Sequence, residues 1–303
     1  MNGIAVIDKP TGMTSFAVVA SMKRLSRERR VGHAGTLDPL ASGVLPVCFG
    51  QATRVIEYLM ESPKSYRAEV ELGVTTDTGD AAGNVIERRD PSSVSHDTLV
   101  TTLERFCGRI EQIPPMFSAL KHRGTPLYRL ARAGLSVERQ SRVAEVYGIE
   151  LVAWDPPVAT IEISCSRGTY VRTLAEDVGK CLGCGASLQN LRRLSYGPFD
   201  VHHSVTLSLL EEAFHQGSEG VFIHPLDVVL GHWPSVVADA ELAGDIVHGR
   251  PVPAGRIQPV IESAALAGSK NRLRAYTLDG RFFGVLRFNP VKNEWQPEKV
   301  FPD

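Results

Sequence analysis

The most informative stretch of this chain is Val31-Gly32-His33-Ala34-Gly35-Thr36-Leu37-Asp38-Pro39-Leu40-Ala41-Ser42-Gly43-Val44-Leu45. Its glycines let the backbone take positive φ or approach a ligand closely, and Pro39 forces Asp38 into an extended conformation. The apolar run that follows, residues 44–49, is typical of a core strand. The pattern predicts a loop that holds one carboxylate and is braced by a buried strand. An Asx-type turn has the same composition, so the loop alone does not establish a function.

The segments around this loop alternate between strand and helix patterns. Strand patterns cover residues 4–7, residues 65–73 and the stretch from Ile161 to Cys165. Helical patterns cover residues 52–60, and three further helices are expected to begin at Thr14 or Ser15, at Ser95 and after Gly168. In the strand 65–73, Tyr66 points inward with the apolar set. Such a tyrosine is either a core residue or a group at a cleft.

The character of the chain changes near Pro225. Residues 239–247 have the pattern of a capped helix, and the remainder indicates short strands, with Asp279-Gly280 as a hairpin turn. We therefore predict two domains, residues 1–228 and a small β-rich domain at residues 229–303.

Length, composition and charge limit the function classes. The chain has 303 residues and a net charge of −1, and it lacks the roughly 18 uninterrupted apolar residues of a membrane helix. No signal peptide is evident, so we expect a cytoplasmic protein. The net charge argues against indiscriminate nucleic-acid binding, but basic clusters of this kind can hold a phosphate backbone or simply be solvated helix faces. The clusters are Lys23, Arg24, Arg27, Arg29 and Arg30; Lys121, His122, Arg123, Arg129 and Arg132; and Arg192 with Arg193.

Metal chemistry is not expected. The five cysteines do not suggest a disulfide framework, and Cys181 and Cys184 have zinc-like spacing without a second pair of ligands. The polar turn 76–84 lacks the ligand spacing of a calcium loop.

Arg172 is unusual because it follows Gly168 at the start of a predicted helix. A cation gains nothing from the helix dipole there, so Arg172 needs an anionic partner elsewhere, unless it forms an ordinary surface salt bridge.

Several blocks of the chain, taken in order, resemble the TruB family of tRNA pseudouridine synthases, of the stand-alone bacterial type. The blocks are Asp8-Lys9-Pro10-Thr11-Gly12-Met13-Thr14-Ser15, Gly32-His33-Ala34-Gly35-Thr36-Leu37-Asp38-Pro39, Cys48-Phe49-Gly50-Gln51-Ala52-Thr53-Arg54, Lys64-Ser65-Tyr66-Arg67, Pro114-Pro115-Met116-Phe117-Ser118-Ala119-Leu120-Lys121, Ser166-Arg167-Gly168-Thr169-Tyr170-Val171-Arg172-Thr173-Leu174, and Gly183-Cys184-Gly185-Ala186 with Leu191-Arg192-Arg193-Leu194. The resemblance is strong over about residues 1–200 and weak beyond.

The resemblance implies an isomerase that converts uridine to pseudouridine at position 55, in the TΨC loop of tRNA. Nothing is oxidised, reduced or hydrolysed, so no cofactor is expected. By the same resemblance Asp38 is the essential carboxylate and must be ionised, and Arg172 lies against it. An adjacent guanidinium lowers the pKa of a carboxylate by about 1–3 units, which is the shift that we expect for Asp38.

The resemblance also implies how the RNA is held. Tyr66 stacks on the target base and takes part in proton transfer, Tyr170 and Leu191 shape the uracil pocket, and His33 holds the nucleotides of the loop unstacked. The expected phosphate contacts are Lys9, Lys121, Arg123, Arg192 and Arg193.

The implied fold is α+β: a mixed, mainly antiparallel sheet flanked by helices, followed by a small C-terminal barrel of the PUA type that binds RNA. We expect a monomer that acts on tRNA without an obligate protein partner or a membrane. The alternatives are a guide-RNA-dependent relative, a non-catalytic protein that binds or folds tRNA, and a glycosidase. A glycosidase needs two carboxylates, and only Asp38 lies in a suitable loop.

Overall fold

The computed structural model describes residues 1–257 and 271–302, which divide into two compact units, Gly3–Ile223 and the chain from His224 onward. The sequence placed this division at residue 228. Residues 258–270 and Asp303 of the predicted C-terminal domain lie outside the described residues.

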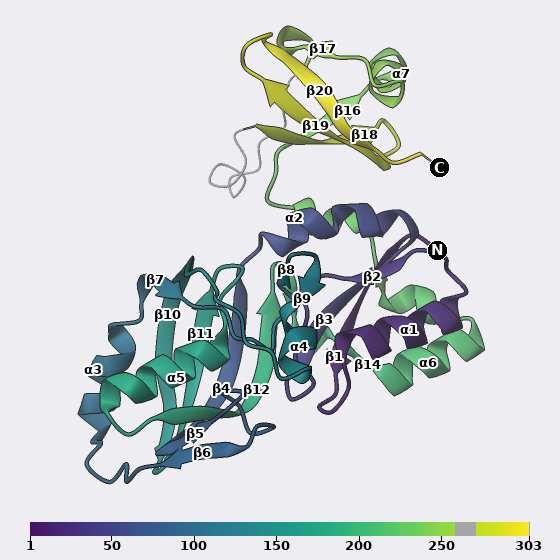
Figure 1. Ribbon diagram of the computed structural model, residues 1–303. Coiled ribbons are helices and arrows are strands. Elements are labelled where there is room, and N and C mark those ends of the chain that lie inside the picture. Colours follow the sequence, from purple (N-terminus) through teal and green to yellow (C-terminus); the bar gives the residue numbers. More distant parts are fainter. Residues whose placement is uncertain (258–270, 303) are drawn as a thin grey trace. The chain divides into compact units, whose positions relative to one another are not determined.

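A long mixed sheet forms the centre of the first unit (Figure 1). Across the sheet its strands are β14 (Val205–Thr206), β1 (Gly3–Lys9), β3 (Ser42–Phe49), β12 (Ala186–Tyr196), β4 (Lys64–Leu72), β11 (Val158–Cys165), β10 (Arg142–Asp155) and β7 (Gly108–Gln112). The β1–β14 and β3–β12 pairs are parallel and the other neighbours on this path are antiparallel. The predicted mixed, mainly antiparallel sheet is confirmed.

Smaller strands surround this sheet. β2 (Val31–His33) pairs with β3 and β13 (Phe199–Asp200) with β12, while two separate hairpins are formed by β5 (Val74–Thr76) with β6 (Val85–Arg88) and by β8 (Lys121–His122) with β9 (Thr125–Pro126). A short strand β15 (Ile223–His224) lies where the two units join in sequence.

The flanking helices of the first unit are α1 (Ser15–Ser26), α2 (Ile56–Met60), α3 (His96–Glu104), α4 (Leu127–Arg132), α5 (Val171–Leu182) and α6 (Leu207–Gln216), with 3₁₀ turns η1 (Gly50–Val55), η2 (Val201–His203) and η3 (Glu219–Phe222). In Figure 1, α1 and α6 lie side by side near β1 and β14, and α3 and α5 cover strands β10, β11 and β4. The core fills the space between these helices and the sheet.

Local sequence explains most of these elements. Thr14 caps α1 and Ser95 caps α3, each accepting a backbone N–H of the first turn as predicted. The predicted helix over 52–60 is only partly present, because η1 replaces its first half. Thr53 donates its hydroxyl to Gly50 O at 2.7 Å, a local bond that competes with regular helix.

The second unit contains a five-stranded sheet in the order β16 (Ser235–Ala238), β18 (Arg272–Thr277), β19 (Phe282–Asn289), β20 (Glu294–Val300) and β17 (Val252–Pro253). It also has α7 (Ala240–Val247), capped by Asp239, and the 3₁₀ turns η4 (Leu226–Leu230) and η5 (Ala254–Arg256). The turn between β18 and β19 contains Asp279-Gly280, with Gly280 at φ 82°, so the predicted hairpin and the small β-rich unit are confirmed. The unit has its own apolar core, which includes Leu273, Phe283 and Trp295.

Candidate active site

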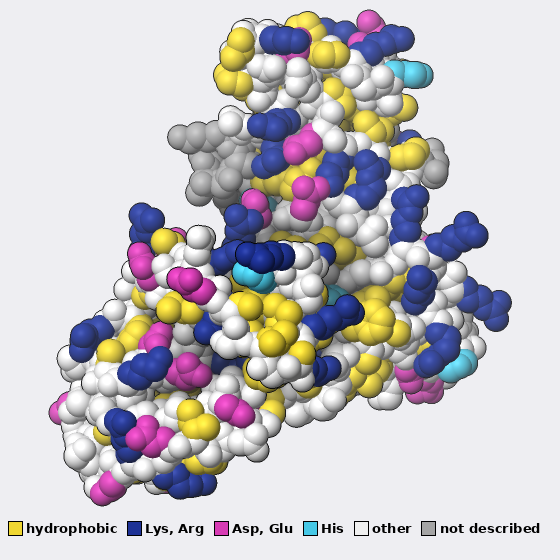
Figure 2. Space-filling view, viewed as in Figure 1, with side chains coloured by type: hydrophobic (Ala, Val, Ile, Leu, Met, Phe, Trp, Pro, Cys, Tyr) yellow, Lys and Arg dark blue, Asp and Glu magenta, His cyan; other side chains and the backbone are white. Residues whose placement is uncertain are grey.

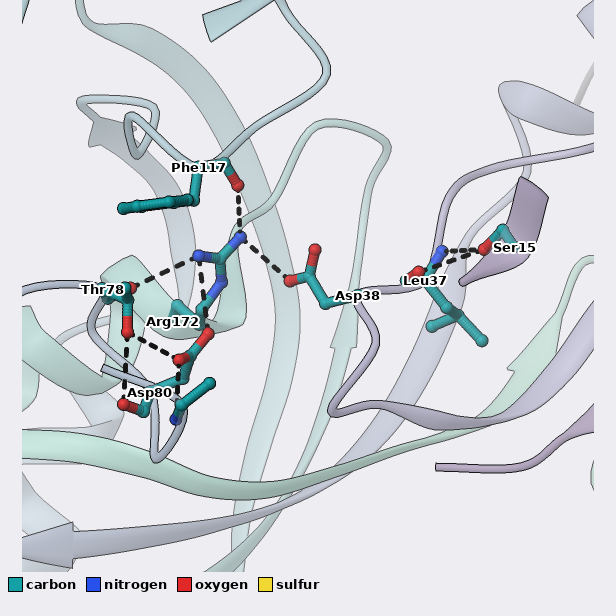
Figure 3. Close-up of polar contacts among 8 residues, drawn as sticks. Ser15, Leu37, Asp38, Thr78, Asp80, Phe117 and Arg172 are labelled. Atoms are coloured by element: carbon teal, nitrogen blue, oxygen red, sulfur yellow. Dashed lines mark hydrogen bonds and ion pairs between the residues drawn. The ribbon is translucent and has the colours of Figure 1, made fainter. Parts of the chain in front are cut away.

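The loop that carries Asp38 lies between β2 and β3 and is fixed on both sides of the carboxylate. Ser15 accepts the Leu37 N–H at 2.9 Å and donates its hydroxyl to the Leu37 carbonyl at 3.0 Å (Figure 3). On the other side, Gly12 N–H donates to Pro39 O at 2.7 Å. The turn before α1 and the first residue of α1 therefore hold the backbone around Asp38.

Arg193 supports the same loop from β12. Its side chain is 1% exposed, and it donates from Nε to Val44 O at 2.6 Å and from Nη2 to Gly35 O at 3.2 Å. This guanidinium is buried and bonded to carbonyls of β3 and of the loop, so it has a structural role here, and its predicted phosphate contact stays a prediction.

Lys9 has a similar structural role at the end of β1. It is completely buried, and its ammonium donates to Pro10 O at 2.9 Å and to Met13 O at 2.6 Å. Burial lowers the pKa of Lys9 to about 8. Lys9 thus holds the turn that bonds to Pro39, and its predicted phosphate contact stays a prediction.

Asp38 and Arg172 form an ion pair (Figure 3), and both line a cavity. Arg172 Nη2 lies 2.9 Å from Asp38 Oδ2, and the side chains are 5% and 38% exposed. Arg172 is the second residue of α5, so the anionic partner that its helix position required is Asp38.

Asp80 is a second carboxylate on Arg172 that the sequence analysis missed. Its Oδ2 lies 3.6 Å from Arg172 Nη1, and it is buried, with Oδ1 accepting from the Thr78 hydroxyl at 2.7 Å. Arg172 also donates to Phe117 O at 2.7 Å and to Thr78 O at 3.3 Å. Asp80 lies in the stretch 76–84, which the sequence showed only as a polar turn. The only hint of a further carboxylate near the site was that Arg172 needed an anionic partner.

The electrostatic balance at Asp38 differs from the expectation. Burial raises the pKa of Asp38 above its ordinary value of 3.8, and the neighbouring Asp80 charge raises it further; together they outweigh the lowering by Arg172 and Lys9. The lowering expected from Arg172 is present, but burial and Asp80 outweigh it, and the sequence showed neither of these two effects.

The cavity beside this pair has a volume of about 270 Å³. Its lining comes from the Asp38 loop, from β4 and β12, and from the start of α5, and includes Gly35, Asp38, Met60, Lys64, Tyr66, Phe117, Ser118, Arg167, Tyr170, Arg172, Leu191, Arg193 and Tyr196. Four of the predicted site residues, namely Tyr66, Tyr170, Leu191 and Arg172, are thus brought together with Asp38.

Tyr66 faces this cavity from β4 and is 8% exposed. Burial raises its pKa, while a hydrogen bond with Arg193 lowers it in part, so the phenol stays protonated at neutral pH. Tyr170 precedes α5, and its backbone is fixed by Gln112, which accepts the Tyr170 N–H at 2.9 Å and donates to its carbonyl at 3.1 Å. Both tyrosines are therefore held firmly at the cavity.

The other predicted binding residues lie outside the cavity lining. His33 is in β2, where burial lowers the pKa of its imidazole and its Nδ1 has no partner among the described residues. Arg192 is half-exposed and pairs with Asp8 at 2.8 Å. Lys121 and Arg123 are exposed at the β8–β9 hairpin. Figure 2 shows Lys and Arg side chains gathered over this hairpin and over α1 and the chain that follows it.

The described residues contain no cluster of three metal-ligating side chains, and Cys181 and Cys184 are free thiols. None of the helices in the described ranges is long and apolar enough to cross a membrane.

The fold and this carboxylate-centred cavity define a pseudouridine synthase. The model of the N-terminal domain of TruB family pseudouridylate synthases matches residues 23–171, and that of a tRNA pseudouridylate synthase B C-terminal domain matches residues 172–231. The chain belongs to the TruB family, and the resemblance found in its sequence is confirmed. As a member of this family, it is an isomerase that forms pseudouridine.

Relatives and solved structures support this assignment. A tRNA pseudouridine synthase B of Dehalococcoides mccartyi is 42% identical over 99% of this chain and 97% of its own, and one of Burkholderia mallei is 44% identical over 95% and 93%. An H/ACA RNP bound to a substrate RNA containing 2'-deoxyuridine matches with a TM-score of 0.75 at 26% identity, and a Cbf5-Nop10-Gar1 complex with 0.76 at 28%; each covers 99% of this chain and 85% of the solved chain.

Proposed function

We propose that this protein converts the uridine at position 55 of the tRNA TΨC loop to pseudouridine and does so alone. The observation that carries the proposal is the Asp38–Arg172 pair at a cavity lined by Tyr66, Tyr170 and Leu191. The tRNA substrate is supported by the names of the most similar relatives.

In the proposed reaction the N1–C1′ bond of uridine breaks, the uracil rotates and a C5–C1′ bond forms; C5 then gives up its hydrogen as a proton, and N1 takes up a proton in its place. The atoms of the nucleoside are conserved, so the reaction needs no cofactor. Asp38 can attack C1′ of the sugar, add to the base, or remove a proton from the sugar. In each of these routes it acts as the carboxylate anion. Arg172 keeps this anion oriented and charged, since burial alone favours the protonated form.

The other cavity residues bind the base. A uridine within a folded RNA loop must be flipped out, at a cost of a few kcal/mol. Stacking on Tyr66 recovers about 1–3 kcal/mol, and Leu191 and Tyr170 shape the pocket around the uracil. The protonated phenol of Tyr66 can donate or relay a proton but is a poor base at neutral pH.

Groups outside the cavity hold the rest of the RNA. Lys121 and Arg123 are exposed and suited to phosphate contacts, and Arg192 is partly available beside Asp8. We propose that the neutral imidazole of His33 helps to hold the loop nucleotides unstacked. We also propose that the unit from His224 onward is a PUA-like domain that binds RNA.

The main alternative is dependence on a guide RNA, and the similarity to a chain of an H/ACA RNP bound to a substrate RNA keeps a ribonucleoprotein context as a candidate. We favour a cytoplasmic, monomeric enzyme without an obligate partner, because the relatives that match almost the whole chain are named tRNA pseudouridine synthases. A paired-carboxylate glycosidase is disfavoured. The second carboxylate, Asp80, is buried against Arg172 and does not line the cavity.

The test is to incubate the purified protein, without any other RNA or protein, with an unmodified TΨC stem–loop and to map pseudouridine by chemical sequencing. Conversion at position 55 alone supports the proposal. Conversion only after a guide RNA is added, or at another uridine only, contradicts it. A stem–loop with cytidine at position 55 is the matched control.

A further inference from the structure

Tyr196 lies at the end of β12 and lines the catalytic cavity, although the sequence motifs assign it no role. Its ring is completely buried and lies close to two cations: Lys64 Nζ is 4.3 Å from the ring centroid and Arg193 Cζ is 4.9 Å from it. Cations over an aromatic face are attracted by the ring quadrupole, most strongly where water is excluded. The ring therefore stabilises two buried positive charges next to the reaction site.

A β-bulge places Tyr196 on the face that holds Arg193. Side chains alternate along a strand, so residues 193 and 196 would ordinarily point to opposite faces. The pairing of β12 with β4 shifts register between Arg193 and Ser195, and both Arg193 and Tyr196 are buried on the cavity side. Across the ladder Arg193 pairs with Tyr66, and Tyr196 pairs with Lys64. The Tyr196 ring thus occupies the row next to the stacking residue Tyr66.

The ring also touches the loop that carries Asp38. A Cβ placed on Gly35 would lie 3.0 Å from Tyr196 Cε1 and 3.2 Å from its hydroxyl oxygen, and Gly35 has φ 71°. The Gly35 carbonyl accepts from Arg193, whose guanidinium lies over the ring. Tyr196 therefore supports Gly35 directly and also through Arg193.

The hydroxyl of Tyr196 does not take part in this support of Gly35 through a hydrogen bond. Tyr196 Oη is buried and has no hydrogen-bond partner among the described residues. An unpaired buried hydroxyl costs free energy, so what Tyr196 contributes must come from its ring.

We propose that Tyr196 is a positioning residue for pseudouridine formation: its ring holds Arg193 and Gly35 in place and thereby sets the position of Asp38 against Arg172. This inference rests on the proposed function, because its main readout is pseudouridine formation in tRNA. It goes further by assigning part of the rate to a residue that does not react.

The first experiment compares Tyr196→Leu, Tyr196→Phe and the wild-type protein in single-turnover pseudouridine formation on tRNA, with tRNA affinity measured separately. A small misplacement of a reacting group costs as much as about 100-fold in rate, so we expect Tyr196→Leu to lose about tenfold or more while its tRNA affinity stays within about twofold of wild type. Tyr196→Phe keeps the ring and is expected to restore most of the rate.

The matched control is Phe49→Leu, which also replaces a completely buried aromatic ring by leucine but in the core away from the cavity. Below its melting temperature it is expected to keep the wild-type rate. Three outcomes would each overturn the proposal. They are a wild-type rate for Tyr196→Leu, an equal loss of rate in Tyr196→Phe and Tyr196→Leu, and a loss in Tyr196→Leu that affects only tRNA affinity.

A second experiment does not depend on activity. Gly35→Ala adds a methyl group 3.0 Å from Tyr196 Cε1, and its penalty in melting temperature is expected to be smaller in a Tyr196→Met background, where the ring is gone. Equal penalties in the two backgrounds would show that the ring and the loop do not press on each other. Because methionine replaces more of the tyrosine volume than leucine does, this cycle decides the contact even if Tyr196→Leu does not fold. An inactive wild-type protein would count against the proposed substrate, not against the contact.

Discussion

Arg172 holds Asp38 from a buried position: its Nη2 lies 2.9 Å from Asp38 Oδ2, while Arg172 itself is only 5% exposed. The guanidinium also donates to Phe117 O and pairs with Asp80, so its position is determined by several elements at once. Asp38 therefore meets a cation that is already in place before RNA binds. Preorganised charges of this kind avoid the cost of rearrangement during the reaction.

The first prediction concerns Arg172 itself. Arg172→Lys keeps one charge but cannot reach Asp38, Asp80 and Phe117 O together, so we expect a rate loss of about 100-fold or more in single-turnover assays. Arg172→Ala should in addition lose about 3–5 kcal/mol of unfolding free energy, because the buried Asp80 is left without its cation. A wild-type rate for Arg172→Lys would show that the simultaneous contacts made by the guanidinium nitrogens are unimportant for the rate.

The second prediction concerns the pH dependence of the rate. Because the Asp80 charge raises the pKa of Asp38, the neutral Asp80→Asn variant should have a lower Asp38 pKa. The acid limb of the pH–rate profile should then move to lower pH, by up to about one unit. Asp77→Asn, in the same turn but away from Arg172, is the control and should not move it. A limb that stays in place or moves upward for Asp80→Asn would contradict this assignment.

The third prediction concerns Lys9 and stability. The pKa of Lys9 is lowered to about 8 from 10.5, so between these values the folded state binds fewer protons than the unfolded state. The free energy of unfolding therefore gains a Lys9 contribution as the pH rises through this window. Denaturant titrations from pH 7.5 to 10.5 should show a smaller rise for Lys9→Met than for wild type. Parallel curves would mean that Lys9 titrates normally.

The fourth prediction concerns RNA binding at the β8–β9 hairpin. Lys121→Ala and Arg123→Ala should each make the slope of log affinity against log salt shallower, by about 0.7–0.9 for each phosphate that the variant no longer neutralises. Their single-turnover rates at saturating enzyme should stay near wild type. Arg88→Ala on β6, another exposed arginine, is the control. An unchanged salt slope for both hairpin variants would remove this hairpin from the interface.

Patterns local in sequence predicted much of the fold and the centre of the site. The caps at Thr14 and Ser95 and the alternation around Tyr66 involve neighbours in the chain, so they were readable without the structure. The glycines and the proline around Asp38 drew attention to its loop, and the resemblance to the TruB family then assigned this carboxylate its role.

Features that depend on tertiary burial were not predictable. Lys9 and Arg193 look like phosphate ligands in the sequence, yet the sheet buries both and uses them to hold the Asp38 loop. Asp80 reaches Arg172 only because the turn after β5 folds against α5. The upward shift of the Asp38 pKa has the same origin, since burial depth is not written in the local sequence.

The measurement that tests the account most directly is tritium release from tRNA labelled at uridine C5, comparing wild type with Asp38→Asn. Formation of the C5–C1′ bond expels that hydrogen, so the account predicts release by wild type and none by Asp38→Asn, with tRNA binding retained by both. Release by both proteins would remove Asp38 from its central role. Absence of release by the wild type, with tRNA still bound, would contradict the proposed activity and favour a protein that only binds or folds tRNA.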